Sequence, residues 1–230
     1  MAKVFKRKGM GLFSAIIALA ALVLIIVAII TEYWVMADLQ RTVLTNGTAV
    51  SQTGGSKTFG LFKGTSSKDY GLGNRQRNFD VKEEFEEVAN NKVVWATVGF
   101  CALSLPFICF GLGMACYNEF SKPNLMVLGT LGVFVMHIIA LVFLLTAACL
   151  YATLFETQLK RNVLRKQDQQ DGFSSTDRAR LGYSYWILLG SAALVIISPL
   201  ALLLSKIHVT HYFKTNKPKE MATADGVMLY

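Results

Sequence analysis

Four long apolar runs constrain this chain more than any other feature of its sequence. They are Met10–Ile30, Val93–Cys116, Leu125–Phe155 and Tyr183–Leu204. Each is long enough to cross the roughly 30 Å hydrocarbon core of a bilayer as a helix, which takes about 20 residues. Lipid offers no hydrogen bonds to the backbone, so runs of this kind must satisfy their own as helices. The sequence therefore predicts an integral membrane protein with four spans.

Charged residues are kept out of these runs. The first three contain none, although the 230-residue chain has 23 Lys and Arg and 15 Asp and Glu. A charge at the centre of a spanning helix costs about 2.5–3.5 kcal/mol on the insertion scale. A helix of a soluble protein would instead carry a charged face that repeats every turn. One membrane domain fits the length, and a second soluble domain has no room.

The formal net charge of +8 is concentrated beside the predicted membrane surface. Basic residues precede the first span and follow the last one: Lys3, Lys6, Arg7, Lys8, Lys206, Lys214, Lys217 and Lys219. A cation near an anionic leaflet gains about 1 kcal/mol. We therefore interpret the charge as a contact with the lipid bilayer, and we expect no nucleic-acid binding.

The positive-inside rule places both chain ends in the cytoplasm. We expect a cytoplasmic N-terminal tail over 1–9, spans at about 10–31, 93–116, 125–155 and 183–204, and a cytoplasmic tail over 205–230. Loops 32–92 and 156–182 are then extracellular. The basic residues of loop 156–182 disagree with the rule, although its acids partly offset them. The first apolar run is too long for a cleaved signal peptide, so a retained signal anchor is favoured.

The first loop contains an N-glycosylation sequon, Asn46-Gly47-Thr48. Sequons also occur by chance, but a sugar at Asn46 requires that the loop be lumenal or extracellular. The sequon and the basic N-terminus thus predict the same orientation, with the protein multi-pass in the plasma membrane.

The first loop also has the alternation of β-strands. Apolar residues alternate from Trp34 to Leu44, Thr58–Phe62 is a second strand candidate, and Gly71–Asn74 indicates a turn. Asp80–Asn90 is predicted to be a short helix. The predicted fold class is all-α membrane: a four-transmembrane-helix bundle with a small extracellular antiparallel β-sheet in the first loop. In the other long loop we expect a polar extension of the third helix and a flexible tip over Gln167–Ser175.

The chain shows no enzyme motif, so we expect neither an enzyme nor a bound cofactor or metal. His208 and His211 have the spacing of a metal pair but no third ligand nearby. His137 lies inside the third span, where an ion site and a packed neutral histidine are both open, the second being favoured.

All four cysteines lie within the apolar runs, which excludes a loop disulfide. Cys116, at the cytoplasmic end of its span, is a candidate for palmitoylation, with a packed free thiol as the alternative. At the other end of the chain, Met228-Leu229-Tyr230 before the free carboxylate suits a PDZ groove or another adaptor. An unremarkable terminus is the alternative there.

Several short motifs resemble the clarin family within the claudin, peripheral-myelin-protein and stargazin group of four-span proteins. The matching pieces are Trp34 after the first span, Phe59-Gly60-Leu61-Phe62-Lys63-Gly64, Tyr70-Gly71-Leu72-Gly73-Asn74, Tyr117-Asn118-Glu119-Phe120-Ser121-Lys122-Pro123, Leu128–Val133 and the Met228-Leu229-Tyr230 end. Claudins have a Gly-Leu-Trp block followed by a cysteine pair, whereas here Phe62 replaces the Trp and both cysteines are missing.

The resemblance implies a claudin-like fold and a non-enzymatic membrane organiser, with clarins associated with sensory cells and membrane–actin linkage. On this reading we assign the loop fold to Trp34, Phe59, Gly60, Leu61, Phe62, Tyr70, Gly71 and Gly73, a cytoplasmic turn to Tyr117, Phe120 and Pro123, and adaptor binding to Met228, Leu229 and Tyr230. The expected partners are other membrane proteins and a PDZ or actin-linked adaptor. An auxiliary subunit of an ion channel is the main alternative, and a transporter or channel is a weaker one.

Overall fold

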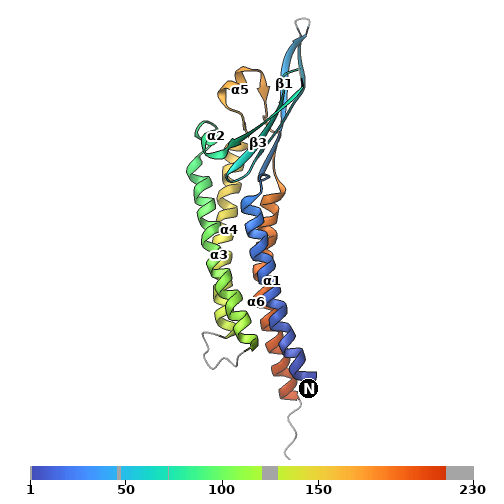
Figure 1. Ribbon diagram of the computed structural model, residues 1–230, viewed down its shortest axis with the longest axis vertical. Helices are drawn as coiled ribbons and strands as arrows, with labels where there is room; N and C mark the ends of the chain where they lie inside the picture. The colour runs from blue at the N-terminus through green and yellow to red at the C-terminus, as the bar shows by residue number, and fades with distance from the viewer. Residues whose placement is uncertain (1, 46–47, 72, 121–128, 216–230) are drawn as a thin grey trace, which may run out of the picture.

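The computed structural model of the protein describes residues 2–45, 48–71, 73–120 and 129–215. Four long helices lie side by side in an elongated bundle, and a small sheet stands at one end of it (Figure 1). The helices are α1 (Ala2–Ile30), α3 (Asn91–Phe120), α4 (Thr130–Leu154) and α6 (Tyr183–Thr215). Both α1 and α4 pack against α3 and α6, so the four form a closed ring.

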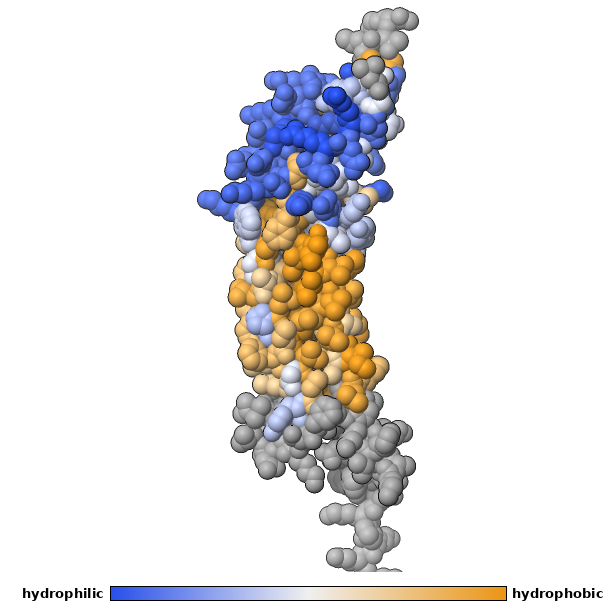
Figure 2. All heavy atoms as spheres, in the orientation of Figure 1, coloured by the Kyte–Doolittle hydropathy of each residue, from blue (hydrophilic) through white to orange (hydrophobic). Residues whose placement is uncertain are grey.

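All four helices contain a segment long and apolar enough to cross a membrane: Leu12–Ile30, Asn91–Tyr117, Thr130–Leu159 and Tyr183–Leu204. On the face that Figure 2 shows, a band of apolar side chains covers the bundle, with a hydrophilic surface beyond it at the end that carries the sheet. The predicted four-span organisation is confirmed, and the chain is a multi-pass membrane protein. The third of these segments includes η1 (Phe155–Leu159), a turn of π-helix that continues α4.

We call the structure at the hydrophilic end of the bundle the cap. It contains four strands from the first long connection, β1 (Val35–Thr45), β2 (Thr48–Phe59), β3 (Lys63–Asp69) and β4 (Asn74–Asp80), followed by the helix α2 (Val81–Val88). The second long connection adds the helix α5 (Lys166–Gln170) and the strands β5 (Phe173–Ser174) and β6 (Ala179–Leu181).

The sheet is antiparallel with the order β4-β3-β2-β1, and both β5 and β6 pair with the remaining edge of β1. The small antiparallel sheet predicted from the first loop is thus confirmed. The participation of the second connection was not predicted, since two- and three-residue strands leave no periodic pattern. The tip expected over Gln167–Ser175 instead carries most of α5 and the strand β5.

One predicted strand is wrong. The stretch Thr58–Phe62 reads as β-forming residues, but β2 ends at Phe59 and β3 begins at Lys63. The residues between them turn the chain, and the Gly60 N–H donates a hydrogen bond of 2.8 Å to the Lys63 carbonyl. The predicted turn over Gly71–Asn74 lies in the connection between β3, which ends at Asp69, and β4, which begins at Asn74. The helix predicted over Asp80–Asn90 is present as α2.

A β-bulge bends the β1–β2 pair at its middle. Leu39 pairs with Gly55 and Gln40 with Thr53, so Gly54 is the extra residue. Gly55 has φ of 125°, and a Cβ there would lie 1.9 Å from the Ser67 carbonyl oxygen. Only glycine fits such a position, because other residues rarely adopt a positive φ and would also strike β3.

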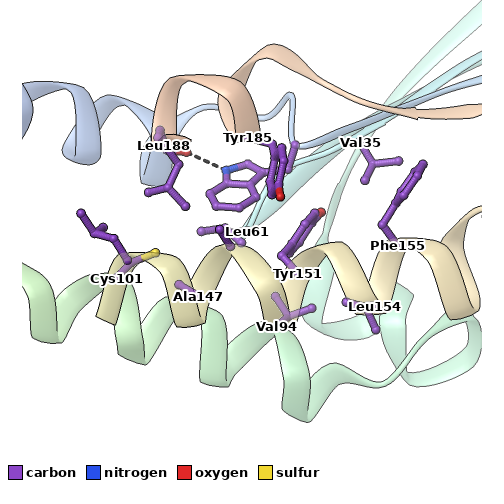
Figure 3. Close-up of a cluster of buried hydrophobic side chains, with 14 of the residues drawn as sticks. Val35, Leu61, Val94, Cys101, Ala147, Tyr151, Leu154, Phe155, Tyr185 and Leu188 are labelled. Atoms are coloured by element: carbon purple, nitrogen blue, oxygen red, sulfur yellow. Dashed lines mark hydrogen bonds between the residues drawn. The ribbon is translucent and has the colours of Figure 1, made fainter. Parts of the chain in front are cut away.

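A single buried apolar cluster runs from the bundle into the cap. It includes Ile25 and Cys101 between the helices, Trp34 and Tyr151 at their upper ends, and Phe85 of α2. Figure 3 shows its middle part, where side chains from the helices and from the turn that follows β2 meet. This cluster therefore joins the cap to the bundle, and two smaller buried clusters lie apart from it, one within the bundle and one within the cap.

Candidate functional site

Trp34 joins three parts of the chain where the cap meets the bundle. Its side chain is fully buried, and its Nε1 donates a hydrogen bond of 2.6 Å to the carbonyl of Ala28 in α1. Its backbone N–H donates to the Phe59 carbonyl at 2.7 Å, and its own carbonyl accepts from the Gly182 N–H at 2.8 Å. A buried tryptophan with its N–H satisfied fixes the positions of the first span, the first hairpin and the last span.

Two tyrosines complete this junction. The Trp34 ring stands edge-on to Tyr151 of α4, with centroids 4.7 Å apart, and to Tyr185 of α6 at 6.3 Å. In Figure 3, Tyr151 and Tyr185 extend from neighbouring helices into the same layer of the core. Edge-to-face pairs of this kind contribute about 0.5–1.5 kcal/mol beyond the area they bury. The aromatic layer therefore closes the upper end of the bundle beneath the sheet.

The motif that follows β2 belongs to the same junction. Phe59 is buried between Phe79 of β4 and Phe85 of α2, with both ring centroids 5.3 Å away. Leu61 is also buried in the shared core. A Cβ added to Gly60 would lie 2.8 Å from both the Glu32 Cα and the Lys63 carbonyl oxygen. Glycine is required there because the turn passes directly against the end of α1.

Phe62 differs from the rest of this motif because it is exposed. It is 42% accessible and stands edge-on to Trp95 of α3, which is 50% accessible, with centroids 6.2 Å apart. The pair lies where α3 enters the apolar band. Tryptophan is enriched at membrane–water boundaries, and Trp95 fits that pattern.

Tyr70, Gly71 and Gly73 form the connection between β3 and β4. Gly71 and Gly73 have φ of 88° and 105°, and the Gly71 N–H donates to Asp69 Oδ1 at 2.8 Å. Tyr70 stands edge-on to Phe173 of β5, with centroids 5.2 Å apart. The tyrosine therefore links the first long connection to the second, while the two glycines provide the turn.

A buried charge network, which sequence reasoning missed, links the two connections more strongly. Lys57 of β2 is 1% exposed, and its Nζ donates to Glu84 Oε1 of α2 at 2.5 Å and to the Val163 carbonyl at 3.2 Å. Arg165 Nε lies 2.8 Å from the other Glu84 oxygen. Burial lowers the pKa of Lys57, although the Glu84 carboxylate opposes that shift. The alternation of β2 was the available signal, since an inward Phe59 implies an inward Lys57.

The remaining predicted site residues stay predictions. Tyr117 is 47% exposed near the end of α3, and Cys116 beside it is partly exposed. The Phe120 side chain lies outside what the structure describes, as do Asn46, Pro123, Met228, Leu229 and Tyr230. The side chains of His208 and His211 are likewise not described.

His137 packs between two helices of the bundle. It is 1% exposed, and its Nδ1 donates a hydrogen bond of 2.8 Å to the Val133 carbonyl of its own helix. The ring presses against Gly111 of α3, where a Cβ would lie 2.4 Å from it. No group of three or more His, Cys, Asp or Glu side chains that could hold a metal ion occurs within residues 2–45, 48–71, 73–120 and 129–215.

Comparison with known proteins gives one consistent family. The profile of the Clarin-2-like family matches residues 5–203. The chain is 25% identical to Clarin-3 of Mus musculus over 215 residues, which is 92% of each chain. It is 25% identical to Clarin-3 of Rattus norvegicus over 175 residues, which is 75% of each chain.

Proposed function

The chain belongs to the Clarin-2-like family, and from that membership we propose that it is a non-enzymatic membrane scaffold or accessory protein. In this proposal it resides in the plasma membrane with both termini in the cytoplasm and the cap outside the cell. The cap and the helix faces dock partner membrane proteins, and the C-terminal tail recruits an adaptor linked to the cytoskeleton. A role in sensory cells follows the resemblance to clarins.

The observation that carries the proposal is the attachment of the cap to the bundle. Trp34 links the sheet to the first and last spans through hydrogen bonds of 2.6, 2.7 and 2.8 Å. Lys57 and Glu84 also tie β2 to α2 and to the chain after α4. Because both sets of contacts hold the cap, its surface has one orientation relative to the membrane. A docking surface held in this way loses little entropy when it binds.

The tail supplies the second half of the proposal. The sequence ends in Val227-Met228-Leu229-Tyr230, beyond the described residues. A PDZ domain adds such an end as a strand and captures its carboxylate in a backbone nest. A protein that holds a membrane partner by its cap and an adaptor by its tail would connect the two.

A second candidate is an auxiliary subunit of an ion channel. The β1–β2 hairpin favours it, because this hairpin extends beyond the rest of the cap in Figure 1. Val50 on β2, paired with Val43 on β1, leaves an apolar side chain 41% exposed there. Such a hairpin suits contact with the outer surface of a neighbouring channel.

Co-purification from native membranes tests the scaffold proposal. The tagged full-length chain is extracted in mild detergent, beside a variant that lacks Met228–Tyr230. We expect membrane partners with both forms and cytoplasmic adaptors with the intact tail only. A stoichiometric channel partner and no adaptor would favour the auxiliary subunit. Ion or solute flux by the purified protein in liposomes would contradict both.

A further inference from the structure

The strand β4 forms a free edge of the sheet. It pairs with β3, and no other described strand lies beside it. Residues Asn74 to Asn78 are all exposed. A free edge of this kind presents unpaired N–H and C=O groups that can hydrogen-bond to another extended chain. The edge is therefore available to a partner strand.

Basic side chains crowd the face of the sheet next to that edge. Arg75 lies directly opposite Lys68 in the β3–β4 register, and Arg77 lies opposite Ser66. Ser66 in turn lies opposite Lys57 on β2. Like charges directly opposite each other destabilise a sheet. The arrangement of Arg75 beside Lys68 therefore calls for a compensating anion.

Two of these cations, Lys57 and Lys68, already have a compensating anion. Lys57 is paired with Glu84, and Lys68 forms an ion pair with Asp168. Among the residues that the structure describes, neither Arg75 nor Arg77 forms a salt bridge. The two arginines alternate with Gln76 along β4 and share a face with Phe79, which packs inward on Phe59.

A groove of about 440 Å³ runs beneath these arginines, between the sheet and the segment that follows α4. Its charged lining comprises five basic and three acidic side chains: Lys57, Lys68, Arg75, Arg77, Arg165, Glu84, Asp168 and Asp171. The Ser66 hydroxyl, which lines it between Lys57 and Arg77, is buried and has no hydrogen-bond partner among the residues that the structure describes. The groove thus combines excess positive charge with an unsatisfied hydroxyl.

We propose that the β4 edge and this groove bind an extended acidic segment of a partner protein. The segment adds a strand to β4, and its carboxylates, on alternate residues, meet Arg75 and Arg77. Main-chain hydrogen bonds provide affinity in this mode and the alternate side chains provide selectivity. Guanidinium groups suit it because they bind carboxylates through two parallel hydrogen bonds. The inference rests on the proposed docking role of the cap and specifies its partner.

Two other occupants fit less well. A second copy of the chain would bring β4 against β4 and place Arg75 and Arg77 of the two copies beside one another, which is repulsive. An anionic lipid headgroup would satisfy the arginines but would leave the edge of β4 unpaired. An acidic strand uses both features.

The test is direct binding of a peptide to the full-length chain in uncharged nanodiscs. The probe is a fluorescent seven-residue peptide that alternates Glu with Thr. Control peptides replace Glu with Gln, replace Glu with Lys, or carry N-methyl groups that prevent strand pairing. The Arg75→Glu/Arg77→Glu variant is compared with Lys82→Gln/Arg161→Gln, which removes two exposed cations elsewhere on the cap.

We expect the glutamate peptide to bind the wild type and the Lys82/Arg161 control equally. Its affinity should fall at least tenfold for the arginine variant, for the Gln peptide and for the N-methylated peptide. The Lys peptide should recover binding on the arginine variant, which shows that this variant is folded. Equal binding by both variants would overturn the proposal. So would arginine-dependent binding to phosphatidylserine vesicles without peptide binding. Either result leaves the co-purification test of the scaffold role unaffected.

Discussion

Lys57 on β2 and Glu84 on α2 form an ion pair of 2.5 Å, and their side chains are only 1% and 8% exposed. The pair closes the cap against the chain that follows α4, because Lys57 also donates to the Val163 carbonyl. Glu84 has a second cation, since Arg165 lies 2.8 Å from its other oxygen. Lys57, in contrast, forms a salt bridge with one anion among the described residues, Glu84. The two partners are therefore not equivalent.

That asymmetry predicts different costs for removing each partner. Glu84→Gln leaves the buried Lys57 ammonium without its anion, a loss that typically costs about 3–5 kcal/mol. Lys57→Met leaves Glu84 paired with Arg165 and puts an apolar side chain beside Phe59 and Phe79, so it should cost less. Thermal unfolding of the purified chain in detergent measures both. Equal destabilisation, or a larger effect of Lys57→Met, would contradict this assignment.

The same pair predicts a pH dependence. Burial lowers the pKa of Lys57 in the folded protein, while Glu84 raises it, so Glu84→Gln should lower this pKa further. Between the folded pKa and the value of about 10.4 in the unfolded chain, the unfolded state binds more protons, and stability rises with pH. The melting temperature of Glu84→Gln, relative to wild type, should therefore recover as the pH rises above neutral. The Lys57→Met/Glu84→Gln variant lacks the amine and should show no such recovery.

Gly60 should not tolerate a side chain. In Gly60→Ala the new Cβ would meet the Glu32 Cα, the Lys63 carbonyl and the Thr31 carbonyl at 2.8 to 2.9 Å, all of them backbone atoms. We expect a loss of about 1–3 kcal/mol, the usual cost of such overpacking. Gly99→Ala is the matched control, because nothing lies within 4 Å of its Cβ. Thermal unfolding should separate the two, and similar melting temperatures would contradict the close approach of this turn to α1.

The helical part of the fold was predictable because each span repeats the same simple requirement over many residues. Runs such as Met10–Ile30 and Tyr183–Leu204 need only be apolar and uncharged, and lipid then enforces the helix. The strand alternation after Trp34 was also readable, since it continues through β1. Trp34 itself was singled out, but its three hydrogen bonds depend on how distant segments meet.

The cap was less predictable because its contacts are local in space and distant in sequence. Thr58–Phe62 has the residue types of a strand, yet Gly60 must turn there to pass α1. Lys57 sits in a polar stretch where a lysine is normally exposed. Its burial depends on Glu84 and on the Val163 carbonyl, 27 and 106 residues further along the chain. Sequence periodicity records neither partner.

The final prediction concerns the side of the membrane on which the cap lies. Thr45 and Thr48 form the last described pair of the β1–β2 ladder, at the end of the hairpin that lies farthest from the helices in Figure 1. Thr48 is also the last residue of the sequon Asn46-Gly47-Thr48. If the cap is extracellular, Asn46→Gln should abolish a glycosidase-sensitive gel shift of the chain expressed in animal cells. Thr48→Ser keeps the sequon and should retain the shift, whereas Thr48→Ala should lose it. A shift that persists in Asn46→Gln would place the sugar elsewhere. The absence of any shift in the wild type, together with protection of the cap from protease added outside intact cells, would place the cap in the cytoplasm.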